Sequence, residues 1–399
     1  MAHTTTLTSL TPPITVISFF APRSGAHHPI GAMVGLLLLC IGLSLYAPTA
    51  EAKANSKRLK GKNNISAVRT PQPERLYANH PEAMQLADTI AARNPQLSAV
   101  WVRQTIAEAR FLPAVAKAVL PPPVTSPKNW ALYRSRFIDE KRIRAGVKFW
   151  QKNQTILERA ERDTGVPISI LMGVVGVETI YGQNTGNYRT LDALSTLAFD
   201  FPAAHPKAKQ RTAFFISELE AFLNLTQRTG MDPLSVRGSY AGALGLPQFM
   251  PSSWNKYAVD FDGDGRIDLF NSPADVIGSV ANYFKTFRWR TGMPTHYSVE
   301  IDAGSTDMAA LLAPDILPTF TPEQFTAKGA ILQTDALAHP GLLALVELKN
   351  GDDAPTYLAG TDNFYVITRY NWSSYYALAV IELGQEVAKA WTAQIIMAK

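Results

Sequence analysis

Apolar residues recur every three or four positions along most of the chain, from residue 81 to about residue 292. This spacing places them on one face of a helix, so the region is predicted to be mainly helical. The prolines at 121–123 predict a loop within it. The expected helices cover residues 81–93, 98–109, 140–163, 167–181, 212–229 and 273–288.

Beyond residue 294 the pattern changes to short apolar stretches at 297–301, 342–348 and 357–358. Stretches of this length are typical of strands, and Asn350-Gly351-Asp352 is a hairpin signal between two of them. A last apolar segment, 375–394, predicts a closing helix. The predicted fold class is α+β, mainly α. Its parts are a helical core at about 160–292, a small strand-rich insertion at about 294–366 and a closing helix at about 370–395.

The first 52 residues have the pattern of an export signal. An apolar run at 31–47 precedes Ala50-Glu51-Ala52, a cleavage signature with small residues at its first and third positions. The run is shorter than the ~20 residues that span a bilayer. A cleaved signal is therefore favoured, and an uncleaved membrane anchor is the alternative. Leu39 precedes Cys40 where a small residue is expected, which argues against lipid attachment.

Composition and charge narrow the class of protein. The chain has 399 residues, of which 46% are hydrophobic and 18% charged, which excludes a disordered chain and a polytopic membrane protein. The net charge is +5, but residues 53–75 alone hold seven basic residues and one acidic residue. We expect this segment to be a flexible basic linker, and the remainder is too nearly neutral for a nucleic-acid-binding domain. Cleavage after Ala52 would remove Cys40, the only cysteine, and would exclude disulfides and thiol catalysis.

The segment 167–182 is apolar on every side, and its only ionisable side chain before Tyr181 is Glu178. Pro167 and Gly182 are expected to begin and end this helix. A helix without a polar face is buried, and burial raises the pKa of a carboxylic acid. An acid that stays protonated near neutral pH suits general-acid catalysis on a glycosidic bond. The alternative is a structural glutamate paired with an arginine or a backbone amide, and these residues alone leave both interpretations open.

The segment 238–254 contains three glycines spaced as in some phosphate loops. No lysine and helix follow in the required pattern, which excludes nucleotide binding. Glycines also let the backbone approach a ligand closely. Ser239 and Gln248 stand among Tyr240, Phe249 and Trp254, and this mixture of polar and flat apolar groups suits a sugar site. A tightly packed loop without a ligand is the alternative.

A calcium loop is predicted at 260–271. Carboxylates stand at loop positions 1, 3, 5 and 9 with glycine at position 6, which is the pattern of an EF-hand. Asp260, Asp262 and Asp264 would repel one another without a cation. Asn271 occupies position 12, where a glutamate is usual, so Asp275 is expected to supply the missing carboxylate. A single unpaired hand indicates a structural Ca²⁺ site rather than a sensor.

Together these segments resemble the membrane-bound lytic murein transglycosylase B family. The resemblance runs from residue 81 to the C-terminus and is strongest at 173–182, 238–254, 260–284 and 367–382. It implies a lysozyme-like helical core, an additional helical domain, a small β domain and one EF-hand, within a catalytic region at 76–399. It also implies cleavage of the MurNAc–GlcNAc bond of peptidoglycan without water, which leaves a 1,6-anhydro-muramoyl end.

The resemblance also implies roles for individual residues. Glu178 matches the single catalytic acid and base, and Phe214 stands where the family has a tyrosine. The carbonyl of Arg266 joins Asp260, Asp262, Asp264 and Asp275 as calcium ligands. The residues expected at the saccharide are Ser239, Gln248, Tyr133, Arg211, Phe214, Tyr240, Phe249, Tyr283, Tyr370, Asn371 and Tyr376.

The sequence therefore predicts an exported peptidoglycan lytic transglycosylase with a structural Ca²⁺ and no organic cofactor. Its predicted location is the periplasm, and an uncleaved signal would associate it with the membrane. Peptidoglycan strands are the expected partner, and proteins of wall synthesis or division are further candidates. The alternatives are a hydrolytic muramidase and a non-catalytic wall-binding scaffold. Asp192 and Asp200 lie downstream of Glu178, and we expect them to serve in caps or salt bridges rather than in catalysis.

Overall fold

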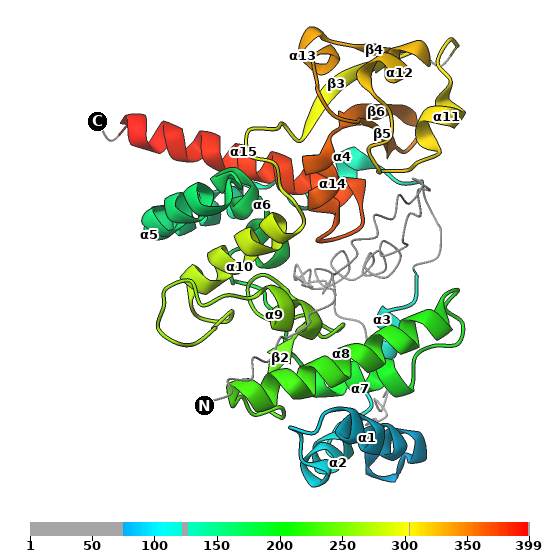
Figure 1. The fold of residues 1–399 in the computed structure, drawn as a ribbon, viewed down its shortest axis with the longest axis vertical. Helices are drawn as coiled ribbons and strands as arrows, with labels where there is room; N and C mark the ends of the chain where they lie inside the picture. The colour runs from blue at the N-terminus through cyan, green and yellow to red at the C-terminus, as the bar shows by residue number, and fades with distance from the viewer. Residues whose placement is uncertain (1–74, 122–126, 303, 398–399) are drawn as a thin grey trace, which may run out of the picture. The chain divides into compact units, whose positions relative to one another are not determined.

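The computed structural model describes residues 75–121, 127–302 and 304–397. The predicted export signal and the linker up to residue 74 lie outside these residues. The helices are α1 (Pro81–Arg93), α2 (Ala99–Ala107), α3 (Pro113–Ala118), α4 (Trp130–Ser135), α5 (Glu140–Thr164), α6 (Ile168–Thr179), α7 (Thr190–Phe199), α8 (Ala208–Thr229), α9 (Pro251–Tyr257), α10 (Pro273–Thr286), α11 (Met308–Leu312), α12 (Pro322–Ala327), α13 (Thr334–Leu337), α14 (Asp362–Thr368) and α15 (Ser374–Met397), with the short 3-10 helix η2 (Tyr77–Asn79) before them (Figure 1). The strands are β1 (Tyr188–Arg189), β2 (Arg237–Gly238), β3 (His296–Ile301), β4 (Ala330–Leu332), β5 (Ala344–Asn350) and β6 (Asp353–Gly360).

The apolar helix α6 packs against α5, α10 and α15 (Figure 1), and all its residues except Ser169 are buried, as its sequence predicts. Glycines let α6 and α15 meet backbone to backbone. A Cβ atom on Gly173 would lie 2.0 Å from the carbonyl oxygen of Val380, and one on Gly384 would lie 1.9 Å from the carbonyl oxygen of Ser169. Any side chain at these positions would force the two helices apart.

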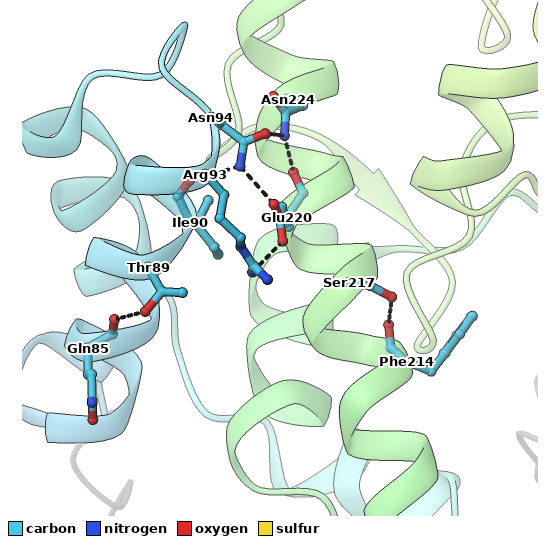
Figure 2. A network of polar contacts seen from close by, with 9 residues as sticks. All are labelled: Gln85, Thr89, Ile90, Arg93, Asn94, Phe214, Ser217, Glu220 and Asn224. Atoms are coloured by element: carbon cyan, nitrogen blue, oxygen red, sulfur yellow. Dashed lines mark hydrogen bonds and ion pairs between the residues drawn. The ribbon is translucent and has the colours of Figure 1, made fainter.

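A polar network joins α1 to α8 (Figure 2). Glu220 of α8 accepts hydrogen bonds from Arg93 and from Asn94, each at 2.7 Å, at the C-terminal end of α1. Asn224, one turn further along α8, donates to the side-chain oxygen of Asn94 at 3.0 Å. The side-chain amide of Asn94, the C-cap residue of α1, thus has hydrogen-bond partners for both its nitrogen and its oxygen. The network fixes the position of α1 relative to α8.

The strand-rich part contains an antiparallel sheet with the order β4-β3-β6-β5. Asn350 of β5 pairs with Asp353 of β6, so the predicted hairpin turn at Gly351 and Asp352 is confirmed. Gly351 has a φ of +72°, a conformation that favours glycine. A hydrophobic cluster that includes Leu311 and Phe325 packs on this sheet.

The long elements agree with the sequence pattern. The six expected helices are present as α1, α2, α5, α6, α8 and α10, the closing helix is α15, and the three short apolar stretches overlap β3, β5 and β6. The short helices α3, α4, α7, α9 and α11 to α14 were not expected, because four to ten residues give too few turns for a periodic signal. The fold is mainly helical with small antiparallel sheets. In the part of the chain that the structure describes, no helix is long and apolar enough to cross a membrane.

Both predicted ends of α6 need correction. Pro167 is extended (ψ 141°) and stands at the N-cap, so the helix begins one residue later, at Ile168. The helix ends at Thr179 rather than at Gly182, because Ile180 and Tyr181 already adopt left-handed backbone conformations with φ of 52° and 55°. A positive φ at the β-branched Ile180 is unusual, and it turns the chain sharply just after Glu178.

Candidate active site

A cavity of about 400 Å³ opens at the C-terminal end of α6. Its walls come from segments far apart in the sequence: the start of α5, the end of α6 with the loop that follows, the glycine-rich loop before α9, and the connection between α14 and α15. Glu178 is the only acidic residue among the described residues that line it. The lining residues are Phe137, Arg142, Val177, Glu178, Ile180, Asn184, Gly186, Asn187, Tyr188, Ser239, Tyr240, Ala241, Ala243, Gln248, Tyr370 and Asn371.

Glu178 is buried, with 7% of its surface exposed. Its Oε1 accepts a hydrogen bond of 2.7 Å from the hydroxyl of Tyr376, and among the described residues its Oε2 has no partner. Burial raises the pKa of Glu178 to about 8, and the hydrogen bond from Tyr376 opposes this rise. A solvated glutamate is ionised at neutral pH, whereas this one is mostly a neutral acid with a proton to donate.

Tyr181 anchors the turn that ends α6. Its hydroxyl oxygen lies close to two glycines. A Cβ atom on Gly146 of α5 would be 2.6 Å from this oxygen, and a Cβ atom on Gly176 of α6 would be 2.5 Å from it. The two glycines thus leave room for the tyrosine ring between the helices. The ring holds the strained backbone at Ile180 in place, and the turn keeps the end of α6 open toward the cavity.

The glycine-rich loop brings Ser239 and Gln248 to the cavity, as predicted from the sequence. The hydroxyl of Ser239 accepts hydrogen bonds from the backbone amides of Ala241 (3.3 Å) and Ala243 (3.0 Å). Gln248 has a φ of 51° and donates from its side-chain amide to the carbonyls of Thr185 and Gly245. Ser239 is therefore held by the loop itself, and Gln248 by the loop and by the segment that follows α6, so both have fixed positions on the cavity wall.

Tyr370 lines the cavity, and the predicted residue Tyr376 is buried beside it and does not line the cavity. The rings of Tyr370 and Tyr376 are nearly parallel, at 11°, with centroids 6.4 Å apart. The Tyr370 hydroxyl donates to the carbonyl of Pro247 and so joins this wall to the glycine-rich loop. The predicted residues Phe249 and Tyr283 lie behind Tyr370, with centroids 5.8 and 4.9 Å from its ring. They support the wall and do not line the cavity.

Three further predicted residues lie outside the lining. The ring of Tyr133 lies beside the cavity, 4.9 Å from that of Phe137, and the Glu178 carboxylate adds to the rise that burial gives the pKa of Tyr133. Arg211 is buried in the first turn of α8. Phe214, one turn later, packs on Phe215 with centroids 5.1 Å apart, and Figure 2 shows it on α8 beside Ser217. The predicted saccharide contacts of these residues stay predictions.

Sequence reasoning missed one wall of the cavity. Arg142, from the first turn of α5, is 6% exposed, forms an ion pair with Asp139 and lies 5.5 Å from the ring of Phe137. The loop residues 184–188 were missed as well. A polar and glycine-rich run directly after α6 was the available signal for that loop. Nothing in the spacing of Arg142 distinguishes it from the exposed Arg144 two residues later.

The two other acids considered near Glu178 are occupied elsewhere. Asp192 pairs with Arg189 at 2.6 Å and accepts the backbone amide of Arg110 at 2.9 Å. Asp200 pairs with Arg75 and with the hydroxyl of Tyr77. Neither lines the cavity. Both therefore have structural partners, in agreement with the expected roles.

The predicted calcium loop brings Asp260, Asp262 and Asp264 together, and one oxygen of each lies within 4.8 Å of the others. Hard carboxylate oxygens at this spacing fit a calcium ion. Asp275 is buried and does not belong to this group. Its two oxygens accept the backbone amides of Phe261 and Asp268, each at 2.8 Å, so in this structure it braces the loop from behind. The ligand roles of Asp275 and of the Arg266 carbonyl stay predictions.

Residues 79–385 match the protein family described as Transglycosylase SLT domain. The chain belongs to this family. This transglycosylase is 38% identical to the membrane-bound lytic murein transglycosylase B of Escherichia coli (strain K12) over 332 residues, which cover 79% of this chain and 84% of that protein.

Two solved structures are similar to this transglycosylase. The lytic transglycosylase Slt35 of Escherichia coli, solved in complex with calcium, has 37% identity and a TM-score of 0.67, over 79% of this chain and 95% of that one. SltB3 of Pseudomonas aeruginosa, solved in complex with NAG-anhNAM-pentapeptide, has 28% identity and a TM-score of 0.62, over 77% of this chain and 79% of that one. The predicted family, the α+β fold class and the assignment as a lytic transglycosylase are confirmed.

Proposed function

We propose that this transglycosylase cleaves the MurNAc–GlcNAc bond of peptidoglycan without water, leaves a 1,6-anhydro-MurNAc end, and uses Glu178 as its single acid and base. The observation that carries the proposal is the one buried carboxylic acid of the cavity. With a pKa of about 8, Glu178 is mostly protonated at neutral pH and can protonate the leaving oxygen of a glycosidic bond.

The absence of a second carboxylate in the described lining supports the route without water. A retaining glycosidase needs a nucleophilic carboxylate about 5–5.5 Å from its acid, and an inverting one needs a base about 6.5–9.5 Å away. With neither present, the substrate supplies the nucleophiles. The bond from C1 of MurNAc to the leaving oxygen breaks as Glu178 gives that oxygen its proton, and the 2-acetamido oxygen stabilises the cationic C1.

Glu178 is then a carboxylate and acts as the base. It takes the proton from the 6-hydroxyl of the same MurNAc as O6 attacks C1, which closes the anhydro ring and returns Glu178 to its acid form. Ring closure within one sugar gains from proximity, because no second molecule has to be ordered. The hydroxyl of Tyr376 fixes the carboxylate and stabilises its charge between the two steps. The complex of SltB3 with NAG-anhNAM-pentapeptide supports an anhydro product.

Mass spectrometry of the products formed in ¹⁸O water tests this proposal. Anhydro products without label at C1 are expected. Labelled reducing ends as the major species would make the protein a hydrolytic muramidase, and the absence of any cleavage would make it a wall-binding scaffold. Glu178→Gln should lower the rate by at least about 10²–10⁴-fold. Asp192→Asn and Asp200→Asn should stay within about ten-fold of wild type, because their partners lie outside the cavity.

We also propose that the loop of Asp260, Asp262 and Asp264 holds a structural calcium ion, which the calcium complex of Slt35 supports. A ligand that binds only the folded state stabilises it by about 2.7 kcal/mol at a hundred times its Kd. Removal of calcium with a chelator should lower the melting temperature, and Asp262→Asn should abolish this dependence. Asp352→Asn, at the exposed hairpin turn, is the matched control and should keep it. An unchanged melting curve on chelation would contradict the site.

Finally, we propose that the chain acts outside the cytoplasm, where peptidoglycan lies. The support is the apolar run at 31–47 with its cleavage signature. Cell fractionation with N-terminal sequencing of the mature protein tests both export and cleavage. A mature chain that begins at Lys53 is expected, and an intact N-terminus in the membrane fraction would indicate the uncleaved anchor. Partners among proteins of wall synthesis or division stay a prediction.

A further inference from the structure

Arg142 lines the cavity at Glu178, and the proposed reaction does not use it. Arg142 and Glu178 are the only charged residue types among the described residues that line this cavity. Glu178 is mostly a neutral acid at neutral pH, because burial raises its pKa to about 8. A guanidinium group stays charged in proteins. The cavity therefore has a positive charge when it receives the substrate.

The ion pair with Asp139 leaves this charge on the cavity side. The side chain of Arg142 is 7% exposed, whereas that of Asp139 is 34% exposed. Asp139 does not line the cavity. A ligand in the cavity thus contacts Arg142 and not the carboxylate that pairs with it. Water also screens the carboxylate more than the guanidinium, so the pair neutralises the cavity only in part.

Arg142 also has a free hydrogen-bond donor. Its Nη1 pairs with Asp139, and its Nε is buried without a partner among the described residues. The ring of Phe137, whose centre lies 5.5 Å from the guanidinium carbon, offers no acceptor oxygen. A buried N–H group without an acceptor is costly, so this position favours a ligand that brings an acceptor oxygen.

The sugars of a glycan strand differ in the groups that they offer to such a donor. The acetamide of GlcNAc is neutral, and its carbonyl oxygen accepts hydrogen bonds. Removal of the acetyl group leaves an ammonium group, which is positively charged and has only donors. We propose that Arg142 is a specificity-determining residue, which makes the enzyme prefer glycan with N-acetylated GlcNAc over glycan with free amines at these sugars. This inference rests on the proposed function, because it places the glycan in the cavity.

The expected discrimination follows from the repulsion between the two cations. At a separation of about 10 Å and an effective dielectric constant of about 20, this repulsion lowers affinity by roughly ten-fold. Added salt should change the discrimination little, because the guanidinium is buried. The acetamide of MurNAc is kept in both substrates, because the proposed ring closure needs its oxygen.

Kinetics on two forms of one soluble glycan test the inference. Fully N-acetylated strands are compared with the same strands after a deacetylase has removed acetyl groups from GlcNAc only. The wild-type enzyme should have about ten-fold higher kcat/KM on the acetylated strands. The double variant Asp139→Asn, Arg142→Gln should bring the two values to within about two-fold of each other, because no cation remains beside the ligand.

Asp139→Asn alone is the matched control. It loses the same ion pair, and asparagine can replace aspartate as the N-cap of α5, so the helix start is kept. Its preference for acetylated strands should be at least that of the wild type, since the cation stays. Should the double variant fail to fold, Asp139→Asn, Arg142→Met replaces it, because methionine keeps an apolar stem in the buried position.

A purely structural role of the ion pair would give the control and the double variant the same preference, and this result would overturn the inference. Equal kcat/KM values of the wild-type enzyme on the two substrates would overturn it as well. Failure of the proposed function is distinguishable, since it would appear as hydrolytic products or no products from the wild-type enzyme on acetylated strands.

Discussion

The burial of Glu178 should make the stability of the fold fall with rising pH, and Glu178→Gln should remove this dependence. The pKa of Glu178 is about 8 in the folded protein against the usual 4.5, because burial disfavours the charged form. The folded-state value is the higher one, so the folded protein holds the proton more tightly. The stabilisation is therefore complete below pH 4.5 and is lost as the pH rises through 8.

The two pKa values set the size of the effect. Their difference means that about 5 kcal/mol of unfolding free energy, present at low pH, is lost once the pH exceeds both values. Between pH 5 and pH 9 the wild-type protein should lose about 4 kcal/mol relative to Glu178→Gln. Glutamine has nearly the same shape and stays neutral, so the variant is expected to be the more stable protein at pH 9 while it has no activity.

Urea unfolding followed by tryptophan fluorescence at pH 5, 7 and 9 measures this difference. Glu158→Gln, which removes an exposed carboxylate from α5, is the control and should follow the wild-type curve. A difference between Glu178→Gln and wild type that stays constant across the pH range would refute the reasoning, because it would mean that Glu178 is charged equally in the folded and unfolded states.

Two further substitutions test the surroundings of Glu178. Tyr376→Phe removes the hydrogen bond to Glu178, and bonds to charged groups are worth about 1.5–3 kcal/mol. The pKa of Glu178 should rise, so the alkaline limb of the kcat/KM profile should move up by about one to two pH units; movement to lower pH would contradict this. Gly173→Ala should lower the unfolding free energy by at least about 1–3 kcal/mol, because the added methyl meets the Val380 carbonyl at 2.0 Å. Gly304→Ala, whose nearest neighbouring atom would be 3.4 Å away, is the matched control. Equal melting temperatures for the two alanine variants would exclude the helix contact as the cause.

The sequence predicted well those features that depend on long, regular patterns. Helix α6 was expected to be buried because it lacks a polar face, and a raised pKa for Glu178 followed from that burial alone. The three aspartates of the proposed calcium loop were expected to converge because their spacing is local, within five residues. In each case the physical cause lies within one segment, so no knowledge of the tertiary fold was needed.

Features that depend on contacts between distant segments were not predictable in this way. Gly182 was expected to end α6, but the helix ends earlier because Tyr181 inserts between Gly146 and Gly176, and Gly146 belongs to another helix. Arg142 reaches the cavity only because α5 packs against α6. Asp275 was expected to be a metal ligand, and this role stays a prediction, but the hydrogen bonds of its two oxygens to backbone amides were not foreseen. Periodicity within a segment carries no information on such contacts.

The position of Tyr376 shows how packing and chemistry are joined in this fold. Helices α6 and α15 run antiparallel, because Gly384 faces the carbonyl of residue 169 and Gly173 faces that of residue 380. Four residues forward along α6 thus correspond to four residues back along α15. The next step of this register pairs residue 177 with 376, which brings the Tyr376 hydroxyl to the adjacent Glu178 at 2.7 Å. Gly173 and Gly384 therefore set more than the spacing of two helices. They fix the register at which a hydrogen-bond donor meets the proposed catalytic acid, so the carboxyl group is held in place by the fold itself.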